Sequence, residues 1–162
     1  MHLDGSCHCG LVRFTLESPA PWPYQRCYCS ICRKTGSGGF MINLGGDAKS
    51  LVVQGEENVA VYRVDLGEGR LSKHGRHFCR ECGCHLWAYS ERWPDLVHPV
   101  ASAIDTPLPK PPRHVHMMVG SRAQWVPVDA GEEDSTFDDY PEQSLADFHR
   151  DGGYDDTAAP SD

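Results

Sequence analysis

The 162-residue sequence has no long apolar run, and none of its stretches approaches the length needed to cross a membrane. Its first residues, Met1-His2-Leu3-Asp4-Gly5, supply neither the charged region nor the apolar region of a secretory signal. The chain is therefore expected to be cytoplasmic and to have no membrane partner. Because thiols stay reduced in that compartment, clustered cysteines indicate metal binding or catalysis rather than disulfides.

Positive charge is also scarce. The sequence has 15 Lys and Arg against 23 Asp and Glu, which gives a formal net charge of −8 at pH 7. Thiolates around bound metal ions would make the chain more negative still. A protein this acidic is a poor candidate for binding nucleic acid or an anionic surface, so we expect no nucleic-acid partner. The sequence leaves the oligomeric state open.

Long helical patterns are missing as well, because 16 Gly and 12 Pro divide the chain into short runs. Residues 17–26 contain three prolines and are expected to form a connector, and a short helix or turn can begin near residue 33. The pattern predicts a mainly β protein of short antiparallel sheets with few or no helices. Strands are expected at 11–16, 40–44, 50–54, 59–64, 86–89, 97–104 and 114–119.

The length favours one domain, which we place at residues 1–130. Residues 131–162 are acidic, polar and glycine-containing. We expect this C-terminal tail to wrap the surface and then become disordered.

Four of the eight cysteines form two closely spaced pairs. In extended backbone, the Cys7 and Cys9 sulfurs would point to the same side of the chain. The spacing Cys79-x-x-Cys82-Gly83 is typical of a zinc knuckle, in which glycine permits a positive φ. Together the pairs supply the four sulfurs of a closed structural zinc site.

Three further thiols, Cys27, Cys29 and Cys32, fall within six residues. Three protein ligands is the number that an open, reactive zinc site retains, so we expect these residues to be catalytic. Three thiolates would leave a zinc ion with net negative charge, which favours holding a thiol over polarising an aldehyde. Arg33 and Lys34 follow directly and are the nearest cations in sequence that could bind a substrate carboxylate. The alternative, to which we give equal weight, is that both are solvated charges on the surface.

An alternative hypothesis is a non-catalytic zinc scaffold or interaction protein. The eighth thiol, Cys84, or a histidine could supply a fourth ligand and close the second site. The sequence shows no evident general base. The histidines of interest are His74, His77 and His85 near the second knuckle, and His114 and His116, which would share one face of a strand.

Three motifs resemble the glutathione-dependent formaldehyde-activating enzyme family, which includes centromere protein V. They are GSCHCGLVRF at 5–14, CYCSICRKTG at 27–36 and FCRECG at 78–83, in matching order and separation. The resemblance covers about residues 3–128. The sequence departs from the family pattern at Tyr28, where histidine is common, and at Cys84, where a small polar residue is common.

The resemblance implies a zinc-stabilised β-tent and two zinc ions per chain. It also implies a carbon–sulfur lyase that condenses glutathione, or a similar thiol, with formaldehyde or another small aldehyde. The expected partners are therefore a small-molecule thiol and an aldehyde. The implied ligands are Cys7, Cys9, Cys79 and Cys82 for the structural zinc, and Cys27, Cys29 and Cys32 for the open site.

Overall fold

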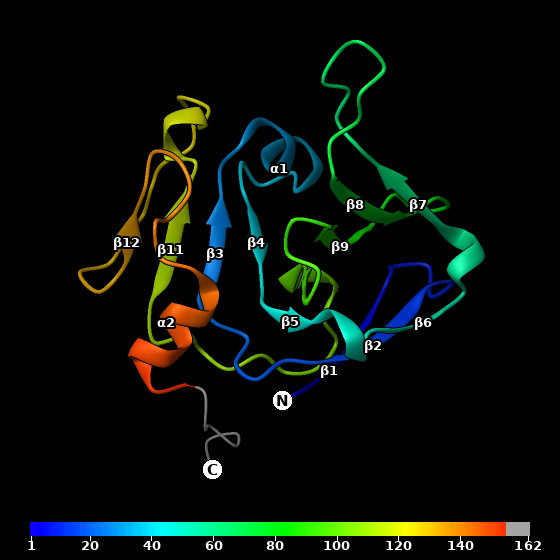
Figure 1. The fold of residues 1–162 in the computed structure, drawn as a ribbon, viewed down its shortest axis with the longest axis horizontal. Helices are drawn as coiled ribbons and strands as arrows, with labels where there is room; N and C mark the ends of the chain where they lie inside the picture. Colours follow the sequence, from blue (N-terminus) through cyan, green and yellow to red (C-terminus); the bar gives the residue numbers. More distant parts are fainter. Residues whose placement is uncertain (155–162) are drawn as a thin grey trace. The chain divides into compact units, whose positions relative to one another are not determined.

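The computed structural model describes residues 1–154 and contains two compact units (Figure 1). The first unit combines Met1–Ser18 with Gly45–Leu108. The second combines Pro19–Leu44 with the chain from Pro109 onward. Each unit is thus built from two separate stretches of sequence.

The first unit contains two antiparallel sheets. The three-stranded sheet has the order β1 (His2–Ser6), β2 (Arg13–Glu17) and β6 (Val52–Gln54). The five-stranded sheet has the order β5 (Gly46–Asp47), β10 (Leu96–Pro99), β9 (His85–Ser90), β8 (His74–Cys79) and β7 (Val59–Tyr62). The connections include the 3₁₀ turns η1 (Ala48–Ser50), η2 (Glu56–Asn58) and η3 (Ala101–Ala103).

The core of the first unit follows the two-residue period of its strands. In β2, Phe14 and Leu16 are buried and alternate with more exposed residues. The Phe14 ring meets Trp87 of β9 edge to face, with centroids 5.2 Å apart. Gly5 of β1 is required beside this ring, because a Cβ at this position would lie 2.3 Å from Phe14 Cζ.

The second unit contains a four-stranded sheet in the order β12 (Ser135–Thr136), β11 (His114–Met117), β3 (Tyr24–Cys27) and β4 (Met41–Asn43). β4 is antiparallel to β3, whereas β11 runs parallel to both β3 and β12. Parallel neighbours need a long connection, and the chain between β3 and β11 includes the residues 45–108 of the first unit. The unit also contains α1 (Ser30–Thr35), η4 (Val119–Ser121) and α2 (Leu145–Gly152).

The expected mainly β architecture with few helices is confirmed. Two local expectations are wrong: residues 24–26 belong to β3 rather than to a connector, and the pairs β3–β11 and β11–β12 are parallel. The boundary at residue 130 stays a prediction. Beyond it the structure contains β12 and α2, and residues 155–162 of the expected tail lie outside the described residues. No helix within residues 1–154 is long and apolar enough to cross a membrane.

Candidate metal centres and active site

The first unit brings together Cys7, Cys9, Cys79 and Cys82, whose sulfurs all lie within 4.8 Å of one another. The Cys7 and Cys9 sulfurs are 3.4 Å apart, and those of Cys9 and Cys79 are 3.7 Å apart. Four thiols in one compact group match the donor set of a closed structural zinc site. The four residues are those that the sequence spacing indicates.

The Cys7–Cys9 pair reaches this position through a turn, not through the extended backbone that we expected. The Gly10 N–H donates to the Cys7 carbonyl at 3.0 Å, and Gly10 adopts a φ of +76°. This turn reverses the chain and brings the Cys7 and Cys9 sulfurs close together. Glycine suits this position because it enters the left-handed region without a steric penalty.

The second pair forms the expected knuckle. Cys79 ends β8, and the Gly83 N–H donates to its carbonyl at 2.8 Å with a φ of +72° at Gly83. Backbone N–H groups of Cys84 and Cys9 lower the pKa of Cys82 to about 6. Cys82 can thus be a thiolate at neutral pH, which is the form that binds metal.

The second unit brings together Cys27, Cys29 and Cys32, again with all sulfurs within 4.8 Å. Cys27 ends β3, and Cys29 caps α1 by accepting the Cys32 N–H at 3.4 Å. Cys27 and Cys32 are buried, and Cys29 is half-buried. Hydrogen bonds from the Cys27 and Cys32 thiols lower the pKa of Cys29. Among residues 1–154, no His, Cys, Asp or Glu joins this group as a fourth ligand.

A hydrogen-bonded chain begins at Tyr28, between two of these cysteines. The buried Tyr28 hydroxyl lies 2.9 Å from Nδ1 of His116 on β11. Nε2 of His116 lies 3.3 Å from Oδ2 of Asp134. Asp134 also accepts the N–H groups of His114 at 2.6 Å and Gly131 at 3.0 Å. Burial by itself would raise the pKa of Asp134, but these N–H groups hold it well below its usual range.

These hydrogen bonds account for the positions of both histidines of β11. Both ring nitrogens of His116 are engaged, one by Tyr28 and one by Asp134. His114 Nδ1 lies 3.4 Å from the same carboxylate. Neither histidine belongs to a group of metal-ligand geometry within the described residues. The sequence alone singled out neither the link to Tyr28 nor the role of Asp134.

The two predicted cations occupy α1 but differ in their surroundings. Arg33 is half-buried, and its Nε atom is buried without a hydrogen-bond partner in the described part of the chain. Lys34 is exposed. A guanidinium group with an unsatisfied buried N–H next to a cysteine group can bind a carboxylate, because such a contact would supply the missing acceptor.

Cys84 belongs to neither cysteine group. Its thiol donates to the His85 carbonyl at 3.7 Å, and burial raises its pKa. His85 itself is buried with both ring nitrogens unpartnered within residues 1–154, and burial lowers its pKa to about 4. The structure therefore gives no support to Cys84 as a ligand that completes the three-cysteine group.

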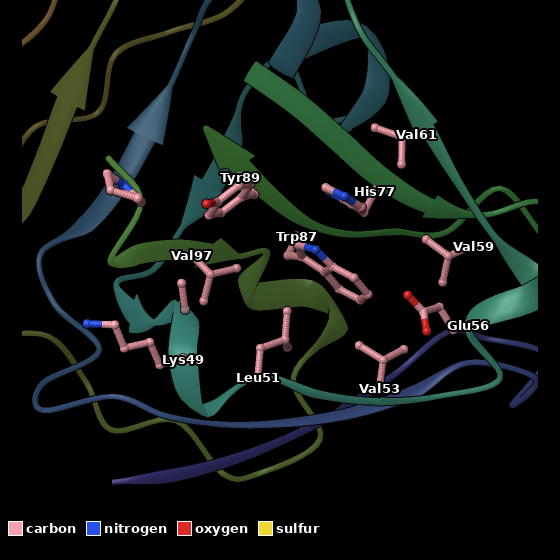
Figure 2. A pocket seen from close by; sticks show the side chains of 12 residues that line it. Lys49, Leu51, Val53, Glu56, Val59, Val61, His77, Trp87, Tyr89 and Val97 are labelled. Carbon is pink, nitrogen blue, oxygen red and sulfur yellow. The ribbon is translucent and has the colours of Figure 1, made fainter. Parts of the chain in front are cut away.

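The first unit also holds a cavity of about 560 Å³ (Figure 2). Its wall includes His77 stacked on Trp87, with ring centroids 5.1 Å apart. The other lining side chains are mostly aliphatic, and none is a cysteine. The cavity therefore offers no thiol, which is the soft ligand that the two cysteine groups supply. Its lining comprises Ala48, Lys49, Leu51, Val53, Glu56, Val59, Val61, His77, Trp87, Tyr89, Pro94 and Val97.

The sequence profile described as "Glutathione-dependent formaldehyde-activating enzyme" matches residues 2–120. The chain belongs to this family. A Halomonas elongata protein, provisionally named as a glutathione-dependent formaldehyde-activating enzyme, is 52% identical over 150 residues, which cover 92% of this chain and 95% of that protein. A crystal structure of a Rhodobacter sphaeroides protein matches with a TM-score of 0.54 and 26% identity, covering 67% of this chain and 92% of that one.

Membership in the family confirms the resemblance that the three motifs indicated. The profile contains all seven grouped cysteines, together with Tyr28 and His116. It ends before Asp134. The last residue of the hydrogen-bonded chain thus comes from sequence that follows the part described by the family profile.

Proposed function

We propose that this family member is a zinc-dependent carbon–sulfur lyase that joins glutathione, or a similar thiol, to formaldehyde or another small aldehyde. The supporting observation is the group of Cys27, Cys29 and Cys32, which has no fourth protein ligand among residues 1–154. When bound there, a zinc ion would have a coordination position for a substrate sulfur and would keep that sulfur as a thiolate at neutral pH. The scaffold alternative would be supported by a fourth protein ligand such as Cys84 or a histidine, and none joins the group among residues 1–154.

The reaction balances without an oxidant or a reductant. The substrate sulfur attacks the aldehyde carbon, and a carbon–sulfur bond forms. The π electrons of the carbonyl move to its oxygen, which takes up the proton that the thiol has lost. The product of glutathione and formaldehyde is S-hydroxymethylglutathione.

The chain's own residues would hold the reactants. The three cysteines fix the metal, and Arg33 binds a carboxylate of the thiol substrate through its buried, unpartnered Nε–H. Such an ion pair would orient the substrate sulfur relative to the cysteine group, which lowers the entropic part of the barrier. Lys34 is exposed and would contribute long-range attraction more than orientation.

The proposal is tested with the purified, zinc-loaded protein. Exchange NMR with ¹³C-formaldehyde and glutathione measures how fast the adduct forms above the uncatalysed rate. We expect the wild type and Cys84→Ser to accelerate the reaction, and Cys29→Ser to lose both the acceleration and one of two zinc ions. A wild-type protein that carries two zinc ions and yet leaves the rate unchanged would contradict the lyase assignment.

A further inference from the structure

We propose that Tyr28, His116 and Asp134 form a positioning unit that sets the sulfur geometry of the three-cysteine group. The inference deepens the proposed function and rests on it to the extent that this group binds zinc. None of the three residues is proposed to touch the substrate. Their role is to hold the turn between the first two ligands in one conformation.

The turn is fixed at two points on Tyr28, the residue between Cys27 and Cys29. Its backbone N–H donates to the Met117 carbonyl at 3.0 Å. Its hydroxyl bonds to His116, the preceding residue of the same strand. Since Cys27 is itself in register with Met117, β11 supports the ligand-bearing turn through both backbone and side chain.

Asp134, at the other end of this series of hydrogen bonds, is also held in place. The Asp134 carboxylate accepts hydrogen bonds from two backbone N–H groups. An ionised carboxylate has no hydrogen to donate, so His116 must be the donor in the bond between them. Nε2 of His116 therefore carries the hydrogen, and Nδ1 is left as an acceptor for the Tyr28 hydroxyl. Tyr28 and His116 are 1% and 0% exposed, and the Asp134 side chain is 9% exposed, so water cannot readily replace these bonds.

Aromatic packing restricts the tyrosine further. The Tyr28 ring stacks on His116, with centroids 5.9 Å apart, and contacts Phe40 at 5.3 Å. Rotation of Tyr28 would break the hydroxyl bond and this packing together. Because both flanking residues are candidate ligands, a change in the backbone at Tyr28 would move two of the three sulfurs, and these side-chain contacts oppose such a change.

Asp134 gives the segment after residue 130 a part in the site. The sequence predicts that residues 131–162 form a surface tail, and the family profile stops at residue 120. Within this segment the structure pairs β12 with β11 and places the Asp134 carboxylate against His116. The support of the metal group in this chain thus includes a residue outside the part that the family profile describes.

The test compares Tyr28→Phe with the matched control Tyr24→Phe. Tyr24 is also buried, lies on the same strand and donates its hydroxyl to the Pro109 carbonyl at 2.6 Å. Zinc affinity is measured by chelator competition on the full chain, and the four-cysteine group serves as the internal reference. Loss of an outer hydrogen-bond partner typically weakens metal binding by about 10- to 100-fold. We expect that loss in Tyr28→Phe, confined to the three-cysteine group, and none in Tyr24→Phe.

A spectroscopic measurement separates positioning from general stability. In the cobalt-substituted protein, Tyr28→Phe and Asp134→Asn should change the absorption of the three-cysteine site and leave that of the four-cysteine site unchanged. Equal weakening of both sites, or unchanged affinity and spectra in both variants, would overturn the proposal. A wild type without lyase activity whose Tyr28→Phe variant still loses zinc selectively would refute the proposed function and leave the positioning role intact.

Discussion

Replacing Cys79 by serine tests the closed metal centre most directly. The Cys9 and Cys79 sulfurs are 3.7 Å apart although 70 residues separate them in sequence. A metal ion bound by both is a cross-link that closes a long loop of the first unit. Such a cross-link restricts the unfolded chain far more than the folded one.

The size of the effect follows from the length of the loop. Closing a loop of this separation removes unfolded-chain entropy equivalent to about 4 kcal/mol at 25 °C by the relation used for disulfides. Each kcal/mol corresponds to a change in melting temperature of about 2 to 4 °C for a chain of this size. Cys79→Ser is therefore expected to lower the melting temperature by roughly 8 to 16 °C.

The assay is thermal unfolding followed by circular dichroism, with zinc content measured on the same sample. Cys84→Ser is the control, because Cys84 is a neighbouring, half-buried thiol that belongs to neither group. It should keep both zinc ions and melt within a few degrees of the wild type. If Cys79→Ser retained two zinc ions and the wild-type melting temperature, the four-cysteine assignment would be refuted.

Three further predictions concern substrate binding, pH and packing. Arg33→Gln should raise KM for glutathione several-fold with little change in kcat; steady-state kinetics showing only a lower kcat would exclude a binding role. The pKa of His85 is about 4 in the folded protein and 6.5 ordinarily, so the unfolded chain binds the proton first as the pH falls, and the free energy of unfolding should decrease by about 3 kcal/mol between pH 6.5 and 4. Denaturant titrations at several pH values should show a smaller decrease in His85→Leu. An equal decrease in that variant would exclude His85 as the cause. Gly5→Ala should destabilise by more than ~2 kcal/mol because its Cβ would overlap Phe14, whereas Gly38→Ala meets no atom within 4 Å and is the denaturation control.

The cysteine groups could be predicted from the sequence because close spacing along the chain already brings their sulfurs near one another. The union of the Cys7 pair with the Cys79 pair followed from the donor count that zinc requires. The backbone conformation of the first pair was harder to predict. Cys7 and Cys9 converge through a turn at Gly10, and the two-residue spacing also fits an extended strand.

The support of the three-cysteine group could not be predicted from local patterns. Tyr28 and His116 are 88 residues apart, and their contact depends on the parallel pairing of β3 with β11. The prolines before Tyr24 indicated a connector, so β3 itself was missed. Asp134 lies in an acidic segment whose composition is typical of a tail, and only tertiary structure singles out this carboxylate.

The division of the second unit into two stretches has a consequence for synthesis of the chain. The first unit is complete in sequence at Leu108, so all four cysteines of its group have been made by then. Cys27, Cys29 and Cys32 are translated much earlier, but β11 and Asp134 follow only after that point. On the ribosome, the four-cysteine group can therefore assemble before β11 and Asp134 are available to hold the turn of the three-cysteine group.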